Sequence, residues 1–224
     1  MVKKATPTRK QNVIYDQLKE DIINGKYDGG TFLLESDLCK EFNVSRTPVR
    51  EALILLAHDQ YIEMIPNRGA FVPQITIKDI KELYELRIAN DGMAAFLCTE
   101  FATPTVIQAM EESIAREANY LASEDFFEAA KEEFLFHSLY VNNCGNQRLI
   151  HVIDSVSHQM MRAMWLGADK NAQMVPGLHY HSELVDAMKA RDPSRARTIM
   201  DAHWQNNKQG YIRRYVEGTI SNKL

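Results

Sequence analysis

The 224-residue sequence predicts a mainly α-helical protein in two parts. Residues 1–75 are expected to form a winged helix-turn-helix domain with a small β-wing, and residues 76–224 an all-α helical bundle. Three features predict this fold. Residues 44–53 combine the capping, proline and apolar residues that are typical of the start of a helix. In residues 61–73, apolar and polar residues alternate on both sides of a turn, as in a β-hairpin. From there onward, apolar residues recur at helical spacing.

The first part opens with two expected helices. Apolar residues repeat at helical spacing over residues 9–24, and Gly25 is a suitable end because glycine readily adopts the left-handed conformation that closes many helices. After a turn at residues 27–30, Leu33 and Leu34 lead into a shorter helix over residues 36–42.

A third helix should begin at Ser45, whose hydroxyl can accept a hydrogen bond from a free amide of the first turn. Pro48 falls inside that turn, where a missing amide proton costs little. Arg46, Thr47 and Arg50 then share the face opposite the apolar residues, as in a helix that enters the major groove of DNA. They could also be an ordinary solvated face, but the capping residue and the following hairpin favour DNA reading.

Two alternating segments come after this helix. Residues 61–65 and 70–73 read as strands, and Pro66-Asn67-Arg68-Gly69 reads as the turn between them. The pattern predicts a β-wing with Arg68 at its tip.

The second part reads as helical throughout, with breaks at proline, glycine and serine positions. These breaks leave a short joint at residues 74–76 and divide the rest of the chain into six expected helices: residues 77–101, 104–121, 124–143, 146–166, 174–190 and 193–217.

Four polar residues lie on the apolar faces of three of these helices. Glu133 and His137 are one turn apart on the third helix, His181 lies on the fifth and His203 on the sixth. Buried imidazoles and carboxylates need partners, and four such groups facing one bundle can satisfy each other by binding a metal ion. Each histidine could instead be a hydrogen-bonded core residue, and Glu133 a helix-edge carboxylate, because spacing alone does not establish that they meet.

Composition limits the remaining possibilities. The formal net charge is −4; residues 1–75 carry 10 basic and 10 acidic residues, against 16 and 20 in residues 76–224. This balance argues against non-specific coating of nucleic acid but allows locally placed arginines to meet phosphates. The three scattered cysteines give neither a disulfide framework nor a cysteine zinc site, and the longest apolar run, residues 52–57, cannot span a bilayer. We therefore expect a cytoplasmic protein.

Motifs in both parts of the chain carry a family resemblance. Residues 44–53, followed by Arg68-Gly69-Ala70-Phe71-Val72, resemble the winged-helix domain of GntR-family transcription regulators. The second part resembles the FCD effector domain of the FadR-like branch through Glu85-Leu86-Arg87, Phe136-His137 and the pair His181 and His203, and its six expected helices are similar to the VanR-like group. The resemblance implies DNA contacts at Ser36, Arg46, Thr47, Arg50, Arg68 and Gly69, with serine at position 36 where some relatives have arginine.

The same resemblance implies a metal centre and an effector contact. The family's usual ligands are one aspartate and three histidines, which here fall on Glu133, His137, His181 and His203, with glutamate replacing aspartate. Such a set suits Zn²⁺, Ni²⁺ or Mn²⁺. Arg87, on the inner face of its helix beside Asp91, would face the carboxylate of an acidic effector.

These expectations describe a homodimeric transcription regulator, expected to be a repressor, that binds a palindromic double-stranded DNA operator and responds to a small organic acid. A dimer is expected because a single helix-turn-helix contacts few base pairs. Two other interpretations stay open. One is a metal-dependent enzyme, against which the lack of a clear second acid or base argues, and the other is a DNA-binding protein whose helical domain serves only dimerisation.

Overall fold

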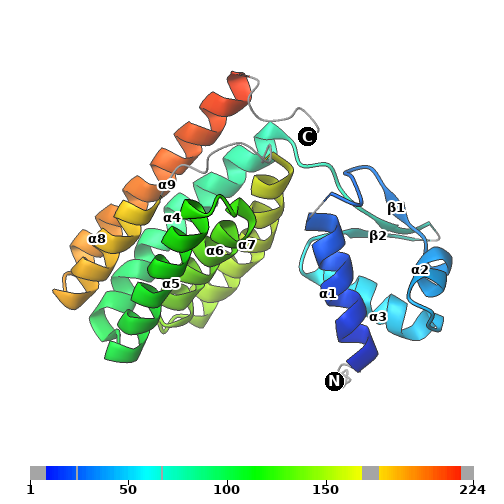
Figure 1. Ribbon diagram of the computed structural model, residues 1–224, viewed down its shortest axis with the longest axis horizontal. Coiled ribbons are helices and arrows are strands. Elements are labelled where there is room, and N and C mark those ends of the chain that lie inside the picture. The colour runs from blue at the N-terminus through cyan, green and yellow to red at the C-terminus, as the bar shows by residue number, and fades with distance from the viewer. Residues whose placement is uncertain (1–8, 24, 67, 168–176, 218–224) are drawn as a thin grey trace. The chain divides into compact units, whose positions relative to one another are not determined.

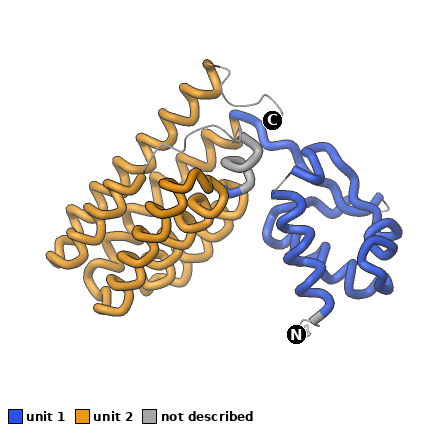
Figure 2. The backbone as a smooth tube through the Cα atoms, in the orientation of Figure 1, with its two compact units in different colours: residues 1–77, 161–167, 223–224 blue, residues 78–160, 168–222 orange. Residues whose placement is uncertain are grey.

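The computed structural model describes residues 9–23, 25–66, 68–167 and 177–217 (Figure 1). The chain divides into two compact units, coloured separately in Figure 2. The first contains the chain up to residue 77 together with residues 161–167, and the second contains residues 78–160 and the C-terminal helices. A largely helical chain with a small sheet near its N-terminal end is the predicted fold class.

Three helices and a small sheet form the first unit. The helices are α1 (Arg9–Ile23), α2 (Glu35–Glu41) and α3 (Arg46–His58), and the strands are β1 (Phe32–Leu33), β2 (Glu63–Ile65) and β3 (Gly69–Phe71). The sheet is antiparallel in the order β1-β3-β2. The core of this unit is a cluster of buried hydrophobic residues that includes Leu18, Ile22, Leu33, Leu53, Leu56, Ile62 and Ala70.

Two details of this unit correct the expectations from sequence. Strand β1 was not predicted, because two residues cannot alternate visibly and Leu33 pairs with Ala70, a residue 37 positions away. Ser45 occupies the N-cap position of α3 with extended backbone angles, but its side chain makes no capping hydrogen bond, so the expected role of its hydroxyl was wrong.

Gly69 has a structural role where the wing approaches β1. Its φ is +98°, and a Cβ added there would lie 2.9 Å from the Leu33 carbonyl oxygen. A side chain would be strained by the backbone conformation and would collide with the neighbouring strand. Glycine is therefore required for β1 and β3 to pair.

Among the described residues, the second unit contains six helices: α4 (Ile77–Phe101), α5 (Pro104–Ala122), α6 (Phe126–Asn142), α7 (Gln147–Gly167, whose last turns belong to the first unit), α8 (Leu178–Lys189) and α9 (Pro193–Val216). The side chains of Thr103, Asp125 and Asp192 accept hydrogen bonds from first-turn amides and so fix where α5, α6 and α9 begin. Residues 174–176, expected in the fifth helix, lie outside the described residues.

Packing in this unit brings the polar residues of several helices together. α5 packs against α6 and α8, and α8 packs against α9. The buried surfaces are largely apolar and include Met110, Phe136, Tyr140, Leu184 and Trp204. Within the described chain, no helix combines the length and the apolar character needed to cross a membrane.

Candidate functional site

The four residues expected to bind metal meet inside the second unit. Glu133 and His137 come from α6, His181 from α8 and His203 from α9. Each offers one ligand atom, these atoms all lie within 4.8 Å of one another, and all four side chains are buried. Ligand atoms around a bound first-row ion lie about 3 to 4 Å apart, so the four are already close to a coordinating arrangement.

The cluster contains buried nitrogen atoms that have no partner among the described residues. These are Nε2 of His137, Nε2 of His181 and Nδ1 of His203. Leaving three polar atoms unsatisfied in one buried place costs free energy, and a divalent cation is the partner that neutral imidazoles and a carboxylate bind best. The donor set therefore fits a metal ion.

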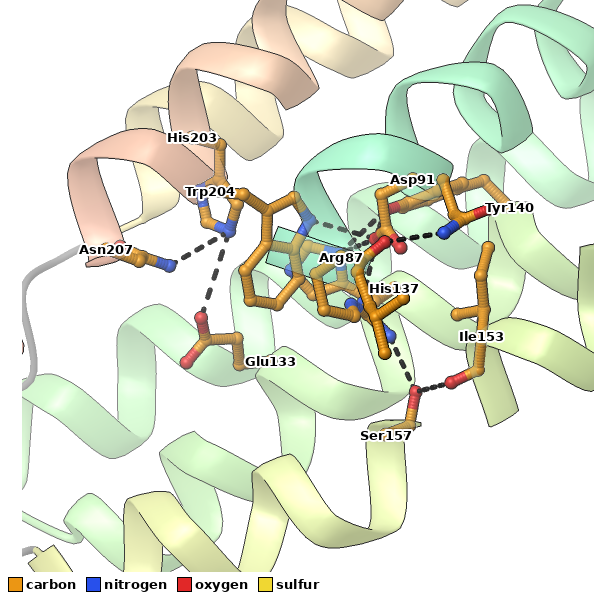
Figure 3. A network of polar contacts seen from close by, with 12 residues as sticks. Arg87, Asp91, Glu133, His137, Tyr140, Ile153, Ser157, His203, Trp204 and Asn207 are labelled. Carbon is orange, nitrogen blue, oxygen red and sulfur yellow. Dashed lines mark hydrogen bonds and ion pairs between the residues drawn. The ribbon is translucent and has the colours of Figure 1, made fainter. Parts of the chain in front are cut away.

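A hydrogen-bonded chain orients His137 (Figure 3). The Tyr140 hydroxyl donates to Asp91 Oδ2 at 2.6 Å and lies 2.7 Å from His137 Nδ1. Because that hydroxyl proton is given to Asp91, the oxygen accepts from His137 Nδ1–H. This places the proton of the imidazole on Nδ1 and the lone pair of Nε2 in the cluster.

The other two imidazoles also have polar neighbours that hold them. His181 Nδ1 lies 3.1 Å from Oε2 of Glu117, and its ring stacks on Phe136 with centroids 4.0 Å apart. Nε2 of His203 lies 3.2 Å from the Asn207 side-chain amide and 4.0 Å from Glu133 Oε1. Each ring therefore has one nitrogen engaged by a neighbour on its own or another helix.

Burial sets the protonation of the cluster. It lowers the pKa of His137 and His203 well below the usual value and that of His181 to about 4, so the imidazoles are neutral at physiological pH. Burial raises the pKa of Glu133 to about 7, and the nearby Glu117 carboxyl adds to this shift. A metal ion would compete with protons mainly at the carboxylates, because the imidazoles are already deprotonated.

Arg87 lies beside the cluster as part of a buried ion pair. Its Nη2 donates to Asp91 Oδ2 at 2.7 Å, its Nη1 donates to the Ser157 hydroxyl at 2.6 Å, and its guanidinium stacks on Trp204 at 4.3 Å. Trp204 Nε1 donates to the same Asp91 oxygen. Arg87 is 1% exposed, and its Nε has no partner among the described residues. The guanidinium is thus neutralised internally in this structure.

Gly177, the residue before α8, approaches the cluster closely. A Cβ added there would lie 2.8 Å from His203 Cε1 and 3.4 Å from His181 Nε2. Its φ of −77° suits any residue, so the position needs glycine for space rather than for conformation. The backbone at Gly177 therefore borders the ligand atoms.

Of the residues expected to contact DNA, all but Gly69 are exposed on the first unit, and Gly69 is half-buried in β3. Arg46, Thr47 and Arg50 are exposed on α3, Ser36 is exposed on α2, and Arg68 is exposed beside β3. Arg68 stacks on the ring of Phe32 at 5.2 Å from its centroid.

Arg50 is held by a neighbour that sequence reasoning did not single out. Its Nε and Nη2 donate to the two carboxylate oxygens of Glu35 at 2.8 and 3.0 Å. A bidentate pair of this kind fixes the plane of the guanidinium. Glu35 therefore limits the directions in which Arg50 can point.

Sequence reasoning found the four clustered residues but missed most of those that hold them. Glu117 had a visible signal, because it follows the buried Met110 and Ser113 at helical spacing on α5. Tyr140 lies one turn after His137 and could have been found in the same way. Gly177 had no such signal, since its role depends on two rings from other parts of the chain.

Comparison with known proteins identifies the family. The FCD domain matches residues 82–206, and the gntR family of bacterial regulatory proteins matches residues 10–72. The chain belongs to the GntR family and carries an FCD domain. The resemblance noted in the sequence is thereby confirmed, and the family's members are transcription regulators.

Individual relatives of this GntR-family chain cover nearly its whole length. The HTH-type transcriptional regulator YdhC of Bacillus subtilis is 28% identical over 205 residues, which are 90% of each chain. The transcriptional repressor RspR of Escherichia coli is 29% identical and covers 89% of this chain and 88% of its own. Among solved structures, E. coli McbR/YncC has the same fold, with a TM-score of 0.77 at 20% identity over 93% of this chain and 99% of its own.

Proposed function

We propose that this GntR-family chain is a homodimeric, metal-containing repressor that releases its operator when a small organic acid binds. Residues 1–75 would bind DNA, and residues 76–224 would bind the metal and effector and hold the dimer together. The observation that carries the proposal is that Glu133, His137, His181 and His203 each bring one ligand atom within 4.8 Å of the others, in a buried place where three imidazole nitrogens have no partner among the described residues. It would act in the cytoplasm, where its operator is.

The metal would be Zn²⁺, Ni²⁺ or Mn²⁺, held by Glu133, His137, His181 and His203. Three imidazoles and a carboxylate suit several first-row ions, and an ion that takes more than four ligands, such as Ni²⁺ or Mn²⁺, would keep coordination positions open. When bound, the ion would supply a positive centre for a carboxylate oxygen of the effector. The protein's own contribution is to hold the rings in place, through Tyr140 for His137 and through Phe136 and Glu117 for His181.

Arg87 is the proposed second contact for the effector carboxylate. Its Nε is free of partners within the described structure, while Asp91 and Ser157 hold its two terminal nitrogens. An arriving acid would have to compete with Asp91 for the guanidinium, so binding would rearrange this network. That rearrangement is the proposed start of the response.

The nature of the effector is supported by chemistry and by one relative. A bound metal ion beside the buried Arg87 would favour the binding of an anion that carries a carboxylate group. The gluconate operon transcriptional repressor of Bacillus subtilis is 25% identical over 192 residues of this chain, and gluconate is such an acid. Gluconate and related short hydroxy acids are therefore the first probes to use.

DNA reading is assigned to the exposed face of α3 with the wing. Arg46, Thr47 and Arg50 would contact the major groove. Ser36 would contact DNA from α2, and Arg68 and Gly69 from the wing. Two copies of this face in a two-fold dimer match a palindromic operator. Replacing Arg46 or Arg50 by Ala should weaken operator binding about 5- to 150-fold if the arginine makes a bidentate guanine contact, with folding unchanged.

Metal analysis tests the central part of the proposal. Protein purified without a histidine tag should contain about one divalent ion per subunit, and stripping the ion should lower the melting temperature, because an ion that binds only the folded state stabilises it. The His137→Ala/His181→Ala double variant is the matched control. The assignment is wrong if that variant keeps stoichiometric metal or if stripping leaves the melting curve unchanged.

A further inference from the structure

Glu117 is a buried carboxylate that none of the assigned roles uses. It lies on α5, is 1% exposed, and its hydrogen-bond partner in the described structure is Nδ1 of His181 at 3.1 Å. An ionised carboxylate in an apolar interior is costly unless something compensates its charge. Glu132, an acidic neighbour on α6, accepts hydrogen bonds from Arg116 and from the Ser113 hydroxyl, so that arginine is already engaged.

The position of Glu117 fits the needs of a metal-bound imidazole. A histidine that binds a cation through Nε2 carries its proton on Nδ1, and that proton has to be donated to an acceptor. Glu117 Oε2 is the acceptor that the described structure places there, while the Phe136 stack fixes the plane of the ring. Together they leave His181 one orientation, with Nε2 in the cluster.

Charge leads to the same conclusion. Arg87 and Asp91 neutralise each other, and the three imidazoles are neutral, so Glu117 and Glu133 are the carboxylates that the described structure places against the clustered imidazoles; the Arg214 guanidinium also acts on Glu133. Two carboxylates of charge −1 balance one cation of charge +2. Both carboxyls are buried, so a cation bound between them would compensate charges that solvent does not reach.

We propose that Glu117 is a positioning residue of the metal centre, which accepts the Nδ1 proton of His181 and supplies the second negative charge that balances a bound dication. The inference rests on the proposed metal centre. Glu117 is thereby assigned to metal binding rather than to the stability of the fold. The residue should lower the stability of the metal-free protein and raise the stability of the metal-bound protein.

The test compares Zn²⁺ affinity with metal-free stability in the full-length chain. Zn²⁺ is titrated into stripped protein in competition with a chromophoric chelator, and the stripped protein is also melted. Glu117→Gln keeps the size of the side chain and an acceptor oxygen but loses the charge. We expect its Zn²⁺ affinity to fall about 10- to 100-fold, while its metal-free melting temperature stays equal or rises.

Two further variants complete the design. Glu117→Met removes the acceptor as well and should bind Zn²⁺ at least as weakly as Glu117→Gln. Glu112→Gln, an exposed glutamate on the same helix, should bind within about threefold of wild type.

The possible outcomes separate the two proposals. A wild-type chain that does not bind Zn²⁺ overturns the metal centre itself. A wild-type chain that binds, with Glu117→Gln within threefold of it, overturns the role of Glu117 alone. A Glu117→Gln protein whose metal-free form melts well below wild type would show a structural residue and would also overturn the positioning role.

Discussion

The Asp91 carboxylate provides a direct test of how the buried polar network supports the bundle. Its Oδ2 accepts hydrogen bonds from Arg87, Tyr140 and Trp204. Burial raises the pKa of Asp91, but the charge of Arg87 and the donated hydrogen bonds oppose that shift. Asp91→Asn keeps the shape of the side chain and removes the charge that neutralises Arg87.

The expected cost follows from the burial of both partners. Arg87 and Asp91 have side-chain exposures of 1% and 0%, so solvent cannot replace the lost partner. Breaking a buried ion pair costs about 3–5 kcal/mol. In a chain of this size each kcal/mol lowers the melting temperature by about 2–4 °C, so metal-free Asp91→Asn should melt about 6–20 °C below wild type.

Thermal melts followed by circular dichroism measure this effect. Asp154→Asn, at an exposed aspartate on α7, is the control and should melt within about 2 °C of wild type. Zn²⁺ affinity gives a second readout, because the Tyr140 hydroxyl then donates to a neutral amide oxygen in place of a carboxylate, which weakens the hold on the His137 proton; we expect a loss of about 10- to 100-fold. An Asp91→Asn protein that melts with wild type refutes the ion-pair argument, and one that melts lower but binds Zn²⁺ equally well refutes the link through Tyr140.

Three further predictions concern the cluster and the DNA-reading face. Burial raises the pKa of Glu133 to about 7 and that of Glu117 to about 8, and protons on these carboxyls compete with a metal ion. The Zn²⁺ affinity of the wild-type protein should therefore rise steeply up to about pH 7, rise more gently to about pH 8 and then level off. Chelator titrations in which the affinity levels off at lower pH would contradict this. In Gly177→Ala the added Cβ would lie 2.8 Å from Cε1 of His203 and would displace that ring. Zn²⁺ binding should weaken about tenfold, while the melting temperature of the metal-free protein stays the same. Unchanged Zn²⁺ affinity would show that the ring has room to move. Glu35→Gln weakens the pair that holds Arg50 and removes a negative charge from the DNA-reading face. Fluorescence anisotropy should then show tighter binding to DNA of scrambled sequence, and a lower ratio of the affinity for the operator to the affinity for scrambled DNA. An unchanged ratio would mean that Glu35 does not orient Arg50.

The parts of the fold that were predictable are those with a long repeating pattern. Helix α4 was expected over residues 77–101 and is observed at those bounds, because its apolar residues recur over many turns. Strand β1 could not be predicted, since two residues carry no period and their pairing depends on β3. The cap of α3 was placed correctly at Ser45, but a sequence does not determine whether the hydroxyl makes the bond.

The candidate site shows the same division. His137, His181 and His203 could be proposed together because each is a polar residue on an apolar helix face. Their supporting partners depend on which helices touch, which is a property of tertiary packing rather than of spacing: Glu117 reaches His181 across 64 residues of sequence. The Arg87–Asp91 pair was visible in advance because four residues along one helix always place two side chains side by side.

The chain between the wing and the buried polar network consists of the short segment 72–76 and the first half of α4. This helix of 25 residues begins at Ile77, shortly after β3 ends at Phe71, and carries Asp91 near its middle. At 1.5 Å per residue, Ile77 and Asp91 lie about 21 Å apart on one rigid rod. A tilt of about 10° imposed at Asp91 would move the first turn of α4 by about 4 Å, without any chain of side-chain contacts between them. The buried contacts of Asp91 therefore fix the direction of the whole helix, including the first turn of α4, which follows the wing after residues 72–76.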